Sequence, residues 1–177
     1  MKRTILKYGL IGGLIMSGLF AISVVIAGDP PDYVMMEIIG YTSMILAMLA
    51  IFFGVKSCRD HLLGGTISFG QGMGVGTGIA TVAAAVLGFY TFAHIAWVDP
   101  NFEEDYSAWQ IETIQQSDMS ETEKAEEIQH VEELLTTMNS PFMQGLVMFA
   151  TVFAMGLVAT LITAAILKRN VPQGAPA

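Results

Sequence analysis

The chain contains few charged residues and almost no cysteine. Charged residues make up 14% of its 177 residues, whereas 53% are apolar, and this balance is far from that of a soluble globular protein. The single cysteine, Cys58, cannot form a disulfide within the chain, and we expect it to stay reduced on the cytoplasmic side. The composition therefore indicates a membrane protein rather than a soluble domain or a disulfide scaffold.

The sequence also lacks the motifs that mark common catalytic and metal sites. It contains no HExxH pattern and no Ser, His and Asp arrangement typical of hydrolases. The three histidines, His61, His94 and His130, are scattered without the spacing of metal ligands. We therefore expect no enzymatic activity, no metal and no cofactor.

Four long apolar stretches are present instead, at residues 8–27, 38–55, 73–98 and 142–167. Each is close to the roughly 20 residues that a helix needs to cross a bilayer. They predict an all-α integral membrane protein, in which residues 1–177 form a single domain of four transmembrane helices.

The start of the chain allows a second interpretation. A basic beginning, an apolar run and the letters VIA before Gly28 also resemble a secretory signal that is cleaved after Ala27. The run is nearer to 20 residues than to the 7 to 15 usual for a signal, which favours a first transmembrane helix. Cleavage would leave the topology of the remaining chain unchanged.

The charges segregate along the chain. Seven of the eight basic residues flank the apolar stretches on one side: Lys2, Arg3, Lys7, Lys56, Arg59, Lys168 and Arg169. Twelve acidic residues lie between Asp99 and Glu133. Because cytoplasmic loops are enriched in Lys and Arg, we predict that both termini are cytoplasmic and that the acidic segment is outside.

Glycine occupies every second position from Gly70 to Gly78. The segment lacks the lysine of a phosphate-binding loop and the GxGxxG spacing, and a lone strand cannot span lipid. In a helix, Gly70, Gly74 and Gly78 lie on one face, and Gly72 and Gly76 on nearly the opposite face. Small residues let helices approach closely, so we predict a central, closely packed third helix. Packing within one subunit, a homo-oligomer contact, and a hinge or pore lining all remain open.

Two polar residues near the predicted helix ends are candidate sites. Glu37 is expected at the outer start of the second helix, where a carboxylate complements the helix dipole, and the alternative is a proton or ion site. His94 is about four residues from the outer end of the third helix, roughly 6 Å along the axis. We expect an interfacial histidine there rather than a buried relay.

The segment between the third and fourth stretches, residues 99–141, is too long for a structureless connection. Ser120 and Glu123 form a capping-box pattern, and five apolar residues recur behind it at helical spacing: Ala125, Ile128, Val131, Leu135 and Met138. Phe102, Tyr106, Trp109 and Ile114 indicate a shorter helix before it, with aromatic rings at the lipid headgroups. We predict an acidic helical extracytoplasmic insertion, whose acidic face is either solvated or a docking surface for a cationic partner.

Several segments resemble the domain-of-unknown-function 4199 family of small bacterial membrane proteins. They are EIIGYTSMI from Glu37, FFGVKSCRD from Phe52, GGTISFGQGMGVG from Gly64 and LITAAILKR from Leu161. The similarity extends over almost the whole chain. The resemblance implies a multi-pass four-helix protein of the bacterial inner membrane, and it supplies no reaction, cofactor or substrate.

Two classes of function follow from these patterns. The first is a structural or accessory membrane protein that contacts membrane lipids and a protein partner or a second copy. The alternative is a small channel or transporter that uses the glycine-rich third helix, but the helix centres carry no charged residue of the kind that marks ion pathways. We expect no nucleic-acid partner.

Overall fold

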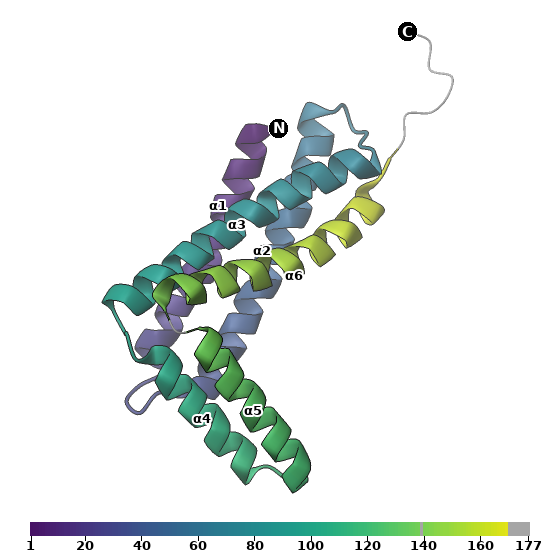
Figure 1. Ribbon diagram of the computed structural model, residues 1–177. Coiled ribbons are helices and arrows are strands. Elements are labelled where there is room, and N and C mark those ends of the chain that lie inside the picture. Colours follow the sequence, from purple (N-terminus) through teal and green to yellow (C-terminus); the bar gives the residue numbers. More distant parts are fainter. Residues whose placement is uncertain (139, 170–177) are drawn as a thin grey trace, which may run out of the picture. The chain divides into compact units, whose positions relative to one another are not determined.

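The computed structural model describes residues 1–138 and 140–169, and this part of the chain contains six α-helices and no strand (Figure 1). The helices are α1 (Lys2–Ile26), α2 (Tyr33–Leu62), α3 (Phe69–Trp97), α4 (Phe102–Gln116), α5 (Glu121–Thr137) and α6 (Pro141–Leu167). The all-α fold class is confirmed.

Four of the helices, α1, α2, α3 and α6, are long and apolar enough to cross a membrane. They contain 25 to 30 residues each, which corresponds to about 38 to 45 Å of helix and exceeds the bilayer core of about 30 Å. Large apolar side chains such as Leu14, Ile45 and Ile166 are exposed along them. Exposed apolar surface of this extent fits a lipid environment better than water.

Helix α2 begins five residues before the apolar stretch that predicts it. Asp32 is the reason, because its Oδ1 accepts a hydrogen bond of 3.0 Å from the N–H of Met35 and so caps the first turn. Glu37 consequently lies in the second turn rather than at the start of the helix. The expectation that Glu37 occupies the helix start is therefore corrected, and Asp32 fulfils that role.

The turn between α2 and α3 depends on two glycines. Gly64 and Gly65 have backbone φ angles of +63° and +85°, which residues other than glycine rarely adopt. Behind this turn, Ser68 Oγ accepts a hydrogen bond from the N–H of Gln71, and Gln71 Oε1 accepts one from the N–H of Ser68. This reciprocal capping box starts α3.

The described residues form two compact units. The first contains Met1–Leu87 and the chain from Phe149, and the second is Gly88–Met148. The division passes through α3 and α6, so the segment predicted as an insertion belongs to a unit that also includes parts of these two helices.

In the first unit, α3 contacts the three other long helices. A Cβ atom placed on Gly9 of α1, Gly54 of α2 or Gly72 of α3 would meet Val82, Ile79 or Ala164, respectively. Helix α3 is thus the central helix of this unit. The core around it consists of Ile51, Val55, Cys58, Ile67, Val75, Ile79, Ala80, Ala159 and Leu167.

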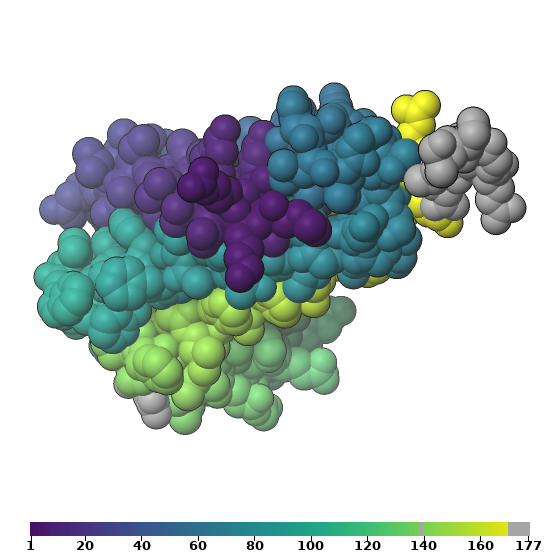
Figure 2. Space-filling model, turned by 90° about the horizontal axis from the view of Figure 1, so that it is seen from above, coloured from purple at the N-terminus to yellow at the C-terminus, as the bar shows by residue number. Residues whose placement is uncertain are grey.

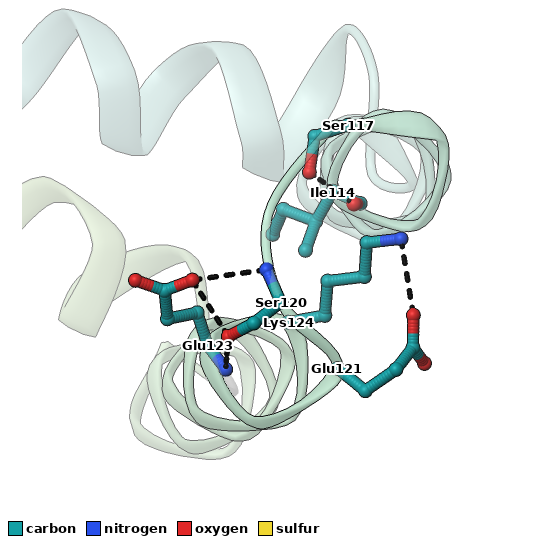
Figure 3. A network of polar contacts seen from close by, with 6 residues as sticks. All are labelled: Ile114, Ser117, Ser120, Glu121, Glu123 and Lys124. Atoms are coloured by element: carbon teal, nitrogen blue, oxygen red, sulfur yellow. Dashed lines mark hydrogen bonds and ion pairs between the residues drawn. The ribbon is translucent and has the colours of Figure 1, made fainter.

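The second unit contains a hairpin of α4 and α5, and Figure 3 shows the turn between them. Ser120 Oγ accepts a hydrogen bond of 3.3 Å from the N–H of Glu123, and a Glu123 carboxylate oxygen accepts one of 2.9 Å from the N–H of Ser120. The capping box predicted from the sequence is confirmed. On the predicted apolar stripe Val131 is buried and Ile128 is half-buried, whereas Ala125 is exposed.

The capping box makes the start of α5 sensitive to acid. Hydrogen bonds from the Ser120 side chain and backbone lower the pKa of Glu123 below its usual range. The cap therefore stabilises the helix fully when the pH is above the pKa of Glu123 in the unfolded chain. This stabilisation is lost as the pH falls through the pKa of Glu123 in the folded protein. We expect the hydrogen-exchange protection of the amides at residues 121–125 to decrease as the pH is lowered through this range.

The matched control for this prediction is Glu123→Gln, which keeps an acceptor in the box but does not titrate. After correction for intrinsic exchange rates, its protection should not change across the same pH range. Equal pH dependence in both proteins would contradict the role assigned to the carboxylate.

Candidate functional site

One close helix contact in the first unit joins α3 and α6 through small residues. A Cβ atom on Gly72 would lie 3.1 Å from Cβ of Ala164, and one on Gly156 would lie 2.7 Å from Cβ of Ala80. Between these contacts, a Cβ atom on Gly76 would lie 2.8 Å from Oγ1 of Thr160. We call these six residues the small-residue seam: Gly72, Gly76, Ala80, Gly156, Thr160 and Ala164.

The seam residues recur every four positions on both helices and in opposite order. This pattern is the small-xxx-small arrangement that lets the backbones of transmembrane helices approach closely. The face of α3 that carries Gly72 and Gly76 is therefore a packing surface.

A second close contact joins α1 and α3. A Cβ atom on Gly9 would lie 2.5 Å from Cβ of Val82, and one on Gly13 would lie 2.6 Å from Cβ of Val86. The sequence interpretation did not single out these two glycines, although their spacing of four residues was a usable signal. Gly78 belongs to the same side of α3, since its Cβ would lie 3.1 Å from Ile5.

Gly70 and Gly74 do not make the close contact with a neighbouring helix that the sequence predicts for them. No heavy atom of the described neighbours lies within 4 Å of a Cβ atom built on either residue. The register between α1 and α3 explains this difference: Gly9 meets Val82 and Ile5 meets Gly78, so four residues earlier Gly74 is level with the beginning of α1. The neighbouring helix does not extend past that level.

An apolar cavity of about 20 Å³ lies between the four helices of the first unit. Its lining contains four methionines and almost no polar atoms. A volume of this size accommodates about one water molecule, which would need polar partners that this lining does not offer. The lining residues are Met16, Met44, Ala47, Met48, Ile51, Ala80, Ala83, Val152, Met155 and Gly156.

His94 lies in the second unit and is 5% exposed, so its side chain is buried in the protein. Its ring stacks on Tyr90 with the centroids 5.9 Å apart and meets the ring of Phe102 edge-on at the same distance. The contacts continue from Phe102 to Tyr106 and from Tyr106 to Trp109. This aromatic ladder attaches α4 to the end of α3.

The second unit also contains a close glycine contact and a buried amide. A Cβ atom on Gly145 of α6 would lie 2.7 Å from the carbonyl oxygen of Gly88 in α3, so these helix segments approach through glycine here too. Gln144 Nε2 donates a hydrogen bond of 3.0 Å to the carbonyl oxygen of Met138. In α4, burial raises the pKa of the Glu103 carboxyl.

The candidate polar residues are divided between the two units. Glu37 is half-buried on α2 in the first unit, and His130 is exposed on α5 in the second. In the described part of the chain, no group of three His, Cys, Asp or Glu residues is arranged to hold a metal ion.

Comparison with known proteins identifies one family. A family model described as "Protein of unknown function (DUF4199)" matches residues 7–169. Neither a curated protein nor a solved structure matches the chain. The match covers α1 from residue 7, all of α2, α3 and α6, and the hairpin, and it assigns no activity to any residue.

Proposed function

We propose that this chain, which belongs to the DUF4199 family of proteins of unknown function, is an accessory protein of the bacterial inner membrane. In this proposal α1, α2, α3 and α6 cross the membrane four times, and the protein supports or binds a membrane partner. It has no catalytic activity of its own.

The observation that supports this proposal is the dry packing of the first unit. Helices α3 and α6 approach through the small-residue seam, and the cavity between the four helices is small and apolar. A channel or transporter would need a polar path for its substrate, usually with ionisable residues near the membrane centre. The packing therefore favours an accessory role over the transport alternative.

The proposed topology has both termini in the cytoplasm and residues 99–141 outside. It can be tested on a variant that carries Cys58→Ala and a new cysteine at Ser117, in the turn between α4 and α5. We expect a membrane-impermeant thiol reagent to label this cysteine in intact cells, because seven basic residues retain the other side in the cytoplasm.

The control for the topology test is a cysteine placed at Lys2 in the same background, which should react only after lysis. The reverse pattern, with Ser117→Cys labelled only in lysed cells, would show that the orientation is wrong. Removing Cys58 first is useful even though it is fully buried, because detergent could expose it.

The accessory role is tested by purifying the intact protein in a mild detergent and identifying what copurifies. We expect a reproducible membrane partner that is retained at near-equimolar amounts. The competing outcome is that the purified protein alone, in liposomes, carries a solute or ion across the bilayer. That result would replace the accessory role with transport.

A further inference from the structure

We propose that the basic end of the first unit binds the headgroups of anionic phospholipids. The inference rests on the membrane insertion proposed above. We call the residues involved the basic collar: Lys2, Arg3, Lys7, Lys56, Arg59, Lys168 and Arg169. They come from the start of α1, the last turns of α2 and the segment after α6.

Packing contacts hold these helix ends at one level. A Cβ atom on Gly54 would lie 3.1 Å from Cβ of Tyr8, so the second turn of α1 lies beside the last turns of α2. The contact of Gly72 with Ala164 places the first turn of α3 beside the last turn of α6 in the same way. Figure 2 looks onto this end, where the start of α1 (dark purple), the α2–α3 turn (blue) and the end of α6 (yellow) are all visible.

A backbone bridge fixes two of the positive charges. The N–H of Ile67 donates to the carbonyl oxygen of Arg169 at 3.0 Å, and the N–H of Arg169 donates to that of Ile67 at 2.9 Å. Ile67 is fully buried in the core, so the bridge is anchored. It holds Lys168 and Arg169 next to the start of α3, where the helix dipole is also positive and the first turn has no acidic residue.

Little negative charge within the protein compensates the collar. Among the described residues, Asp60 is the only acidic residue near these helix ends, and it pairs with Arg59 at 2.6 Å. The other six basic side chains are exposed, and in the described residues none of them forms an ion pair. A bound external anion would offset their mutual repulsion.

The surroundings of the collar favour a lipid over a free anion. Large apolar side chains are exposed within about two turns of it, including Leu6, Leu10, Leu62 and Ile166. A ligand that contacts both surfaces needs a negative headgroup joined to apolar chains. Phospholipids with a net negative charge have this chemistry, and juxtamembrane basic residues attract them.

The test measures lipid binding to the purified full chain in maltoside detergent by native mass spectrometry. The probes are phosphatidylglycerol and phosphatidylcholine with identical acyl chains. We expect the wild-type protein to prefer phosphatidylglycerol, and the double variant Lys168→Gln/Arg169→Gln to bind it about 25-fold more weakly, since each charge contributes about five-fold. The preference should decrease at high salt.

The matched control is Lys124→Gln, which removes the one basic residue outside the collar and should leave the preference unchanged. Circular dichroism establishes that each variant is folded. If the double variant is not folded, the triple variant Lys2→Gln/Arg3→Gln/Lys7→Gln provides the same comparison at the other side of the collar.

Three results would overturn the inference: equal binding of the two lipids by the wild-type protein, unchanged preference in the folded collar variants, or full displacement of the lipid by inorganic phosphate at the lipid concentration. The proposed function fails separately. Carbonate extraction of the protein from membranes would end the membrane assignment, whereas an inserted protein without lipid preference would end only this inference.

Discussion

Replacing Gly76 with leucine should lower the free energy of unfolding of the protein in detergent by about 1–3 kcal/mol or more. The added Cβ atom would lie 2.5 Å from Cγ2 of Thr160, which is too close for any real contact. Thr160 cannot move away easily, because it is fully buried and its hydroxyl donates a hydrogen bond of 2.7 Å to the carbonyl oxygen of Gly156. Helices α3 and α6 would have to separate.

The matched control is Gly74→Leu, two residues away on the same helix. Nothing lies within 4 Å of a Cβ atom at Gly74, and leucine favours both the helix and the lipid more than glycine does. Its unfolding midpoint should equal or exceed that of the wild type. Similar losses in the two variants would show that the seam is not the packing surface.

Light scattering on the Gly74→Leu protein addresses the oligomer alternative. An unchanged mass is expected if Gly70 and Gly74 face lipid. Dissociation of a larger wild-type species would instead identify this face as a contact between copies of the chain.

A second large effect is expected for Gly13→Leu in α1. The new side chain would overlap Val86, whose Cβ lies 2.6 Å from the position of the added atom. The carbonyl oxygen of Ala83, at 3.1 Å, restricts the space further, and a backbone atom cannot change rotamer. We expect a loss of thermal stability comparable with that of Gly76→Leu, because the α1–α3 contact is as close as the seam.

Gly18→Leu is the control on α1, since no heavy atom lies within 4 Å of a Cβ atom at Gly18. It should match the wild type in thermal stability and in mass. If Gly13→Leu also matched the wild type, the first helix would not pack on α3 through Gly9 and Gly13.

Composition and spacing predict the helices well, because crossing a bilayer imposes length and apolarity on each helix separately. Local capping is equally readable, as Ser120 and Glu123 illustrate. The contacts of the glycines are harder to predict. Spacing divides them into two faces, but the lack of a contact at Gly74 depends on how far α1 extends along α3, which is a property of two helices together.

The burial of His94 illustrates the same limit. Its distance from the helix end predicts an interfacial height along α3, but does not predict whether its side chain is buried. Its ring contacts the ring of Phe102, which belongs to the next helix, and sequence spacing does not predict this contact. Glu37 differs for a local reason, since the cap at Asp32 was visible in the sequence and places Glu37 one turn inside α2.

The repeating seam between α3 and α6 also needs a feature that prevents the two helices from sliding along each other. Its small residues recur every four positions, so a shift of one helical turn would bring small residues opposite small residues again. Thr160 breaks this equivalence in one direction, because it lies opposite Gly76, and a shift by one turn toward Ala80 would bring its branched side chain against a methyl group. The one branched member of the row thus opposes a shift toward Ala80, and Thr160→Ala should let the helices slip by a turn in that direction while preserving their close approach.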